Sequence, residues 1–133
     1  MWPEPVERIA AFLRASGASG SLEELPADAE TAPGPALQAE GFECDGRFLV
    51  ALVPDDRRVD RNKVAAAAKC RAIRPTTVGE FPFGGALVFL DRTLLTAETV
   101  WLRAGAEGFV VGLPPADLAR LTRADTVDLL LEA

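Results

Sequence analysis

The residues best suited to chemistry in this chain are a glycine-, proline- and phenylalanine-rich segment, GEFPFGG (79–85), and a carboxylate, Asp91. Glycines let a backbone approach a ligand closely, and their N–H groups can stabilise a developing oxyanion without any titratable side chain. Asp91 ends the strand-like run ALVFLD (86–91) and could supply a carboxylate beside such a segment. Each feature also has a structural explanation: a turn before a buried strand, and a cap for the turn that follows. Spacing alone favours the structural explanations.

The usual nucleophilic machinery is missing from the sequence. There is no histidine, and the three serines, Ser16, Ser19 and Ser21, all lie near the N-terminus, so a Ser-His-Asp or Cys-His arrangement is excluded. No glycine motif of the P-loop or dinucleotide-binding kind occurs. Cys44 and Cys70 form no Cys-x-x-Cys motif, and we expect two reduced thiols, no metal site and no cofactor.

A second conspicuous segment, FLVALVPDDRRVDRNKVAAAA (48–68), passes from an apolar strand through a charged cluster into an alanine-rich helix. The cluster could be a catalytic centre, a nucleic-acid contact, or a solvated connector in which Asp60 starts the helix. Residue types alone leave these three alternatives open.

Length and charge limit the protein class. The chain has 133 residues, which suits one domain, 1–133, with a real core. Its 20 acidic and 14 basic residues give a net charge of −6, so any nucleic-acid contact must be local, and DNA is not an expected partner. No apolar run is long enough to span a bilayer, and the N-terminus is charged where a signal peptide would be apolar. We expect a cytoplasmic protein without membrane contact.

The elements that must position these residues alternate along the chain. An amphipathic helix is predicted in PVERIAAFLRASG (5–17), and two further helices in DRNKVAAAAK (60–69) and PPADLARLTRA (114–124). Strands are predicted at 47–53, 86–90, 98–103 and 108–113, the last two as a hairpin, and weaker ones in CRAIRP (70–75) and TVDLLL (126–131). The predicted fold class is α/β: a single compact domain with a mixed, mostly antiparallel, barrel-like sheet and packing helices.

Five segments, taken in order, resemble the YbaK/ProX class of aminoacyl-tRNA deacylases, to which the editing domain of prolyl-tRNA synthetase is similar. They are LVALVPDDRRVDRNKVAAAA, PFGG, ALVFLDRTLL, ETVWLRAGA and GLPPADLARLTRADTVDL, within about residues 48–130. No one motif is specific, but their order and spacing together are. In this family PDDRRVD corresponds to a connector, which favours the solvated-turn explanation of the charged cluster.

The resemblance implies a trans-editing hydrolase that cleaves the ester between a wrong, small amino acid and the acceptor end of a tRNA. An aminoacyl-tRNA synthetase is a further implied partner. Carried over, the catalytic residues are Asp91 and Gln38, and the substrate-binding residues are Thr31, Gly79, Phe81, Pro82, Phe83, Gly84 and Gly105. Backbone amides would polarise the ester carbonyl while the terminal hydroxyl of the tRNA places a water.

Two departures from the family pattern affect this expectation. The family lysine, on the strand before FLVALV, has no counterpart between Thr31 and Phe48; one alignment places Gln38 there, and another makes ALQAEG (36–41) a helix and deletes the strand. The glycine segment is also one residue short and contains Glu80, which would repel a phosphate. The rival hypothesis is therefore a non-catalytic member that binds an amino acid or aminoacyl group, or docks on a synthetase. A third possibility, a structural homo-oligomer that uses exposed apolar surface, is supported only by the high apolar content.

Overall fold

The computed structural model describes residues 2–25, 33–104 and 106–132. Its helices are α1 (Glu4–Ser16), α2 (Arg61–Ala68), α3 (Pro115–Thr122) and the short 3-10 helix η1 (Arg92–Thr96). Its strands are β1 (Ser21–Glu24), β2 (Leu37–Cys44), β3 (Arg47–Pro54), β4 (Arg74–Thr76), β5 (Ala86–Asp91), β6 (Val100–Arg103), β7 (Phe109–Leu113) and β8 (Asp125–Val127). The three predicted helices and the four stronger strands are confirmed. The two weaker strands are confirmed only in part, since β4 contains Arg74 and Pro75 of the first and β8 contains Thr126 and Val127 of the second. β1 and β2 lie where no strand with defined bounds was predicted.

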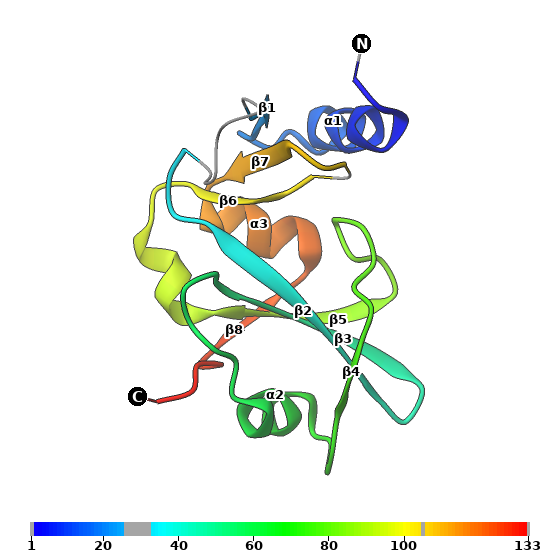
Figure 1. Ribbon diagram of the computed structural model, residues 1–133, viewed down its shortest axis with the longest axis vertical. Coiled ribbons are helices and arrows are strands. Elements are labelled where there is room, and N and C mark those ends of the chain that lie inside the picture. Colours follow the sequence, from blue (N-terminus) through cyan, green and yellow to red (C-terminus); the bar gives the residue numbers. More distant parts are fainter. Residues whose placement is uncertain (1, 26–32, 105, 133) are drawn as a thin grey trace.

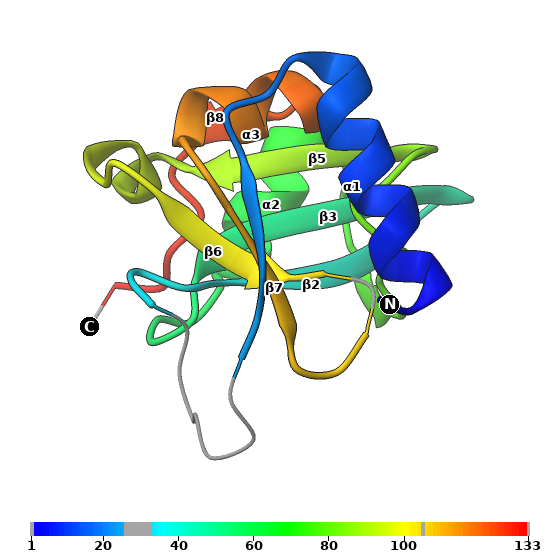
Figure 2. The ribbon, with the colours of Figure 1, turned by 90° about the horizontal axis from the view of Figure 1, so that it is seen from above.

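The strands form two stacked sheets. The larger has the order β4-β2-β3-β5-β8, in which β3–β5 and β5–β8 are parallel and the other pairs antiparallel. The smaller is antiparallel, in the order β1-β7-β6, and β1 runs across the direction of β3 and β5 (Figures 1 and 2). The mixed, mostly antiparallel α/β class is confirmed. The expectation that the four best strands share one sheet was wrong, because β7 takes β1 as its second neighbour.

The central strand β3 is buried on both faces. Val50 and Leu52 pack in a core between the two sheets, whereas Leu49, Ala51 and Val53 pack in a second core toward α2. Such two-sided burial explains the uninterrupted apolar run of its sequence, which is typical of a strand with a parallel neighbour.

The helices cover the sheets in different places. The buried residues of α1 are Val6, Ile9, Ala10 and Leu13, the stripe that the 3.6-residue period predicts, and Gly17 ends the helix in the left-handed region at φ 67°. α2 lies on the opposite side of the large sheet, at the lower end of the molecule in Figure 1. None of the helices in the described residues is long and apolar enough to cross a membrane.

The charged cluster before α2 is an exposed turn with a helix cap at its end. The side chain of Asp60 accepts a hydrogen bond from the backbone N–H of Asn62 at 2.9 Å, which satisfies one of the free donors of the first turn. Residues 55–58 are exposed. The exposed turn and the helix start at Asp60 that the solvated-connector explanation predicts are therefore both present. The arginines of the turn are exposed, so a nucleic-acid contact stays a prediction.

Asp91 is a fully buried carboxylate that holds three segments together. Its Oδ2 accepts hydrogen bonds from the backbone N–H, at 3.0 Å, and the hydroxyl of Thr93, and thereby caps η1. Its Oδ1 accepts from the backbone N–H of Leu129 at 2.8 Å, which fixes the C-terminal segment beside β5. The bonds to Thr93 are those of a carboxylate that caps the following turn, the structural explanation suggested for Asp91 by the sequence.

An ion pair holds the same C-terminal segment to α2. Lys63 Nζ donates to Asp128 Oδ2 at 2.9 Å and to the carbonyl of Leu130 at 2.7 Å. The hydrogen bond lowers the pKa of Asp128 and raises the pKa of Lys63 from their ordinary values. The contribution of Asp128 to stability is thus lost as the pH falls through its lowered pKa, and that of Lys63 as the pH rises through its raised pKa.

The two cysteines are bonded to each other, so the expectation of two reduced thiols was wrong. Cys44 at the end of β2 and Cys70 just beyond α2 form a disulfide, with their Cα atoms 6.5 Å apart. The sequence could not show this, because the two residues meet only once α2 has packed on the large sheet.

Trp101 is a packing residue of β6. It is 9 % exposed, and a Cβ added to Gly112, its partner on β7, would lie 2.7 Å from the indole ring. We expect Trp101→Ala to lower the free energy of unfolding by about 3–5 kcal/mol, measured by urea denaturation. Gly112→Ala should also destabilise, because the ring occupies the space, whereas exposed Leu95→Ala should have an effect within about 0.5 kcal/mol. A Trp101→Ala protein as stable as wild type would contradict this role.

The contacts of Asp91 give a second prediction about stability. Asp91→Ala removes the cap and leaves the buried N–H of Leu129 without a partner, which should cost about 2–4 kcal/mol in urea denaturation. Asp91→Asn keeps one acceptor and should cost less. Exposed Asp55→Ala is the control and should change little. If Asp91→Ala were as stable as wild type but lost its activity, the catalytic role implied by the family resemblance would be supported instead.

Candidate functional site

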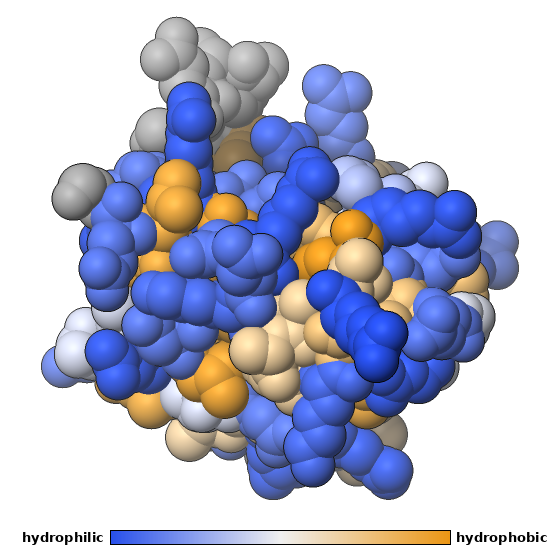
Figure 3. All heavy atoms as spheres, turned by 90° about the horizontal axis from the view of Figure 1, so that it is seen from below, coloured by the Kyte–Doolittle hydropathy of each residue, from blue (hydrophilic) through white to orange (hydrophobic). Residues whose placement is uncertain are grey.

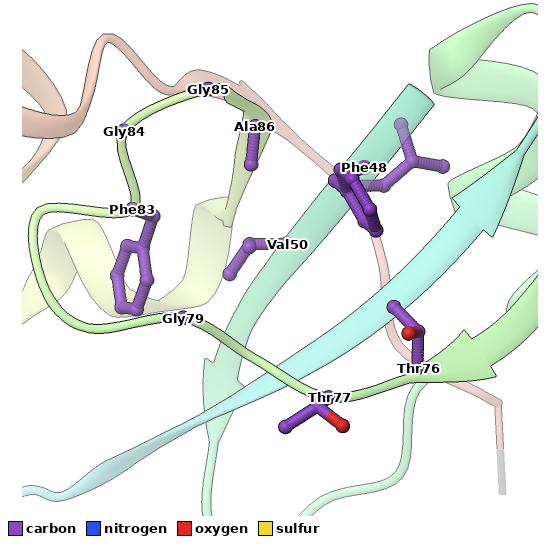
Figure 4. A pocket seen from close by; sticks show the side chains of 10 residues that line it. Phe48, Val50, Thr76, Thr77, Gly79, Phe83, Gly84, Gly85 and Ala86 are labelled. Atoms are coloured by element: carbon purple, nitrogen blue, oxygen red, sulfur yellow. The ribbon is translucent and has the colours of Figure 1, made fainter. Parts of the chain in front are cut away.

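A pocket of about 490 Å³ lies where the glycine-rich segment leads into β5. Its wall is formed by the start of β3, the end of β4, the loop that follows β4 and the start of β5 (Figure 4). The lining residues are Phe48, Leu49, Val50, Thr76, Thr77, Gly79, Phe83, Gly84, Gly85 and Ala86. This volume is within the ordinary range for small-molecule sites, about 300–1,000 Å³.

The pairing of strands creates this place. β3 and β5 are parallel, with Phe48 opposite Ala86, so both strands begin at the same end of the sheet. The loop between β4 and β5 must therefore bring the chain back to that end of the sheet, and this loop closes the pocket. In Figure 4, Val50 and Ala86 extend into the space between Phe83 and Phe48.

Two successive turns shape the loop. The N–H of Phe83 donates to the carbonyl of Glu80 at 2.7 Å, and the N–H of Ala86 donates to the carbonyl of Phe83 at 3.2 Å. Gly85, with φ 84°, supplies the left-handed residue that the second turn requires, and Phe83 is also left-handed at φ 65°. The Phe81–Pro82 peptide bond is cis. Left-handed non-glycine residues are uncommon and occur often at ligand sites.

The loop is anchored to α1 by aromatic and ionic contacts. Phe81 packs edge-to-face against Phe12 of α1 and against Phe83, each with ring centroids 6.0 Å apart. Glu80 lies 3.4 Å from Arg8 of α1, with both side chains exposed. Glu80, the carboxylate that departs from the family pattern, is thus paired with a cation at the surface.

The pocket offers backbone donors and hydroxyls but no ionisable side chain. The amide groups of Gly79, Gly84 and Gly85 donate no hydrogen bond within the part of the chain that the structure describes. Figure 4 shows the side chain of Thr76 directed toward Phe48 and that of Thr77 directed away from it. Such a lining can bind a small neutral or apolar group and stabilise an oxyanion, but it contains no general acid or base.

Only some of the residues predicted for substrate binding line the pocket. Gly79, Phe83 and Gly84 line the pocket, whereas Phe81 and Pro82 do not, Phe81 being buried under the loop. Thr31 and Gly105 lie outside the described residues. Their predicted roles stay predictions.

Gln38 does not line the pocket. It is in strand β2, so the alternative in which residues 36–41 form a helix is wrong. It pairs with Val53 of β3, and β3 separates β2 from β5, so Gln38 and Asp91 are two strands apart, roughly 10 Å between their backbones. The side-chain amide of Gln38 donates to the carbonyl of Arg57 at 3.1 Å.

Asp91 also lies away from the pocket. It is at the far end of β5 from Ala86 and carries the structural hydrogen bonds described above. The structure therefore does not bring the two predicted catalytic residues to the pocket, and their catalytic roles stay predictions.

Sequence reasoning missed six lining residues: Phe48, Leu49, Val50, Thr76, Thr77 and Ala86, as well as Gly85 at the end of the segment that it did single out. Phe48 and Ala86 could have been noticed only in retrospect, since each lies at the start of a strand, next to a polar or glycine-rich turn. The parallel pairing of β3 with β5 could not be read from residue types.

Comparison with known proteins gives a match in structure but not in sequence. No known protein family and no curated protein matches the sequence. A structure described as a "putative trans-editing enzyme for prolyl tRNA synthetase" is 22 % identical, with a TM-score of 0.83 over 99 % of this chain and 100 % of that one. A protein from work on grafting linear epitopes onto scaffolds by computational design is 19 % identical, with a TM-score of 0.82 over 99 % and 100 %.

A third structure, of hypothetical protein APE2540, is 15 % identical, with a TM-score of 0.81 over 93 % of this chain and 99 % of that one. The matches span nearly the whole of each chain, so the two sheets and their helices recur together. At these identities the structural matches show the fold alone, and the function has to be argued from the residues of the pocket. The chain thus has the YbaK-like fold that its sequence predicted, the fold shared with the trans-editing structure.

Proposed function

We propose that this protein hydrolyses the ester of a mischarged aminoacyl-tRNA that carries a small amino acid. The observation that supports this most is the pocket edged by Gly79, Gly84 and Gly85, whose amide groups are without protein partners in the described residues. The fold shared with a structure described as a trans-editing enzyme points in the same direction. Charged tRNA is a cytoplasmic substrate, so we also propose a cytoplasmic location.

The reaction that suits this lining depends on backbone donors. The amide groups at Gly84 and Gly85 would donate to the ester carbonyl oxygen as it becomes negatively charged during attack by water. The terminal ribose hydroxyl of the tRNA would place the water, because the lining has no ionisable side chain to do so. Catalysis of this kind does not need the histidine that the chain lacks.

Selection for small amino acids would follow from the apolar wall. Phe48, Val50 and Phe83 narrow the space in front of Ala86, so a longer side chain would have to displace them (Figure 4). A methylene group more or less in an apolar pocket changes a specificity ratio by about 10- to 200-fold. The pocket therefore suits a size filter better than recognition of a charge.

A local basic surface around α2 suits the tRNA backbone. Eight of the 14 basic residues lie within residues 47–74, together with three acidic ones; they are Arg47, Arg57, Arg58, Arg61, Lys63, Lys69, Arg71 and Arg74. Within the described residues, Arg57, Arg58, Arg61, Lys69 and Arg71 have no carboxylate partner. Figure 3, which looks at the molecule from the α2 side, shows strongly hydrophilic side chains around a small apolar area. We call these five residues the α2 basic face: Arg57 and Arg58 lie in the turn before α2, Arg61 is its first residue, and Lys69 and Arg71 follow its end.

The second candidate function is binding without catalysis. It is favoured by the lack of any ionisable group in the pocket lining and by Gln38, which lies in β2 with its amide bonded to Arg57. Such a protein would hold an amino acid or aminoacyl group in the same pocket, or would dock on a synthetase. Hydrolysis and binding are separated by the first experiment below.

The pocket can be tested by deacylation assays. Purified protein should deacylate at least one of alanyl-, cysteinyl-, seryl- and prolyl-tRNA faster than buffer alone, and Ala86→Leu should lower kcat/KM about 10- to 200-fold by filling the pocket. Leu87→Ala is the matched control: it is the next residue of β5, is exposed, and does not line the pocket, so its rate should stay near wild type.

Two results would decide between the candidates. If no tRNA is deacylated but a non-hydrolysable aminoacyl-adenosine analogue binds, and Ala86→Leu weakens that binding, the binding function replaces the enzymatic one. If the analogue does not bind and no tRNA is deacylated, both candidates fail for this pocket.

The α2 basic face can be tested by tRNA-binding titrations. Arg58→Gln with Arg71→Gln should weaken tRNA binding in a filter-binding or anisotropy titration, and the slope of log K against log salt should fall by about one for each lost phosphate contact. Arg14→Gln with Arg103→Gln removes the same charge at positions outside this face and is the control. Equal weakening by both pairs would indicate a general charge effect and would contradict a specific α2 basic face.

A further inference from the structure

The two cysteines join the end of the β2–β3 hairpin to the end of α2, and their sulfurs lie in different surroundings. Cys44 is 4 % exposed and belongs to the core between the large sheet and α2, whereas Cys70 is partly exposed just beyond the helix. An external reagent therefore reaches Cys70 more readily than Cys44.

Charge distinguishes the two sulfurs further. Arg47 Nη2 lies 3.0 Å from Cys70 Sγ and 4.0 Å from Cys44 Sγ, while a carboxylate oxygen of Asp45 lies 3.7 Å from Cys44 Sγ. A cation next to a sulfur stabilises the thiolate, and a carboxylate opposes it. In the reduced pair, Cys70 should therefore be the cysteine whose thiolate is better stabilised. This holds even before the charges of its chain neighbours Lys69 and Arg71 are counted.

Arg47 is held in this position by a second bond. The same Nη2 donates to the carbonyl of Ala68 at 3.1 Å, one of the last carbonyls of α2, which has no helical partner at the end of the helix. The guanidinium therefore stays beside Cys70 without depending on the sulfur to hold it.

Contacts other than the disulfide also hold α2 on this side of the sheet. α2 is also fixed by the Asp60 cap, by burial of Val64 and Ala68, and by the Lys63 ion pair. Opening the bond thus leaves most contacts of α2 in place. A bond with one partly exposed cysteine, an adjacent cation and other contacts that hold the joined elements has the features of a reactive disulfide.

We propose that Cys44 and Cys70 form a thiol–disulfide exchange site for small-molecule disulfides of the glutathione type, with Cys70 as the attacking thiolate and Cys44 as the resolving thiol. The Cys70 thiolate attacks one sulfur of the oxidised reagent, forming a mixed disulfide and releasing one reduced thiolate. Cys44 then loses its proton to solvent and attacks Cys70 Sγ, releasing a second thiolate. The protein dithiol is oxidised by two electrons and the reagent disulfide is reduced to two thiols.

The first test is redox equilibration of the whole protein. Protein reduced with dithiothreitol is incubated in mixtures of reduced and oxidised glutathione, alkylated, and weighed by mass spectrometry. We expect two alkylated thiols at the reducing end and none at the oxidising end, with the same curve from either direction and with the far-UV circular dichroism retained. A bond that no glutathione mixture opens, or a reduced protein that unfolds, would identify a purely structural disulfide and overturn the proposal.

The second test assigns the roles of the residues. In Cys44→Ser the remaining Cys70 should form a mixed disulfide with glutathione, and adding Arg47→Gln should slow its alkylation at pH 7 about tenfold, because the cation that stabilises the thiolate is lost. Arg47→Lys should restore most of the rate, and Arg74→Gln, which removes a nearby arginine paired with Glu43, should leave it unchanged. Equal rates with and without Arg47 would overturn the assignment of Cys70 as the activated thiol.

Discussion

The burial of β3 on both of its faces is the constraint from which the rest of this structure follows. A strand with apolar side chains pointing both ways needs a layer of packing on each side, and the small sheet with α1 and α3 supplies one layer while α2 supplies the other. β3 also needs hydrogen-bonded neighbours at both edges, β2 and β5. The charged turn after β3 is then forced to the surface, because the strand leaves no polar space inside.

The pocket is a consequence of how β3 pairs. A parallel neighbour cannot be reached by a tight turn, so the chain passes through α2, β4 and a loop before β5 starts beside Phe48. The loop that completes this crossover has glycines and a left-handed phenylalanine because it must bend twice within a few residues. Gly79, Gly84 and Gly85 of this loop therefore line a site walled by apolar strands, where a hydrogen bond to a developing charge would be strong.

The charges of the chain are arranged unevenly around this framework. The whole protein is acidic, but its basic residues gather around α2 and the ends of the strands next to it. Some of them have fixed structural duties: Lys63 ties α2 to the C-terminal segment, and Arg47 caps α2 beside the cysteine pair. Arg74 pairs with Glu43, and the five residues of the α2 basic face are exposed and have no carboxylate partner within the described residues. The side of the molecule that holds the disulfide is thus also the side best suited to meet an anion.

The sequence by itself determined the local elements: the α1 stripe from its 3.6-residue period, the α2 start from Asp60, the strands from their apolar runs, and, through the order of its motifs, the fold. Only the tertiary structure decided which of these elements meet. It paired Cys44 with Cys70, divided the strands between two sheets, joined the buried Asp91 to Leu129 of the C-terminal segment, and set Gln38 two strands away from Asp91. Periodicity and capping depend on neighbours in the chain, whereas a pocket depends on strand pairing between distant segments, and that pairing is fixed by the packing of the whole molecule.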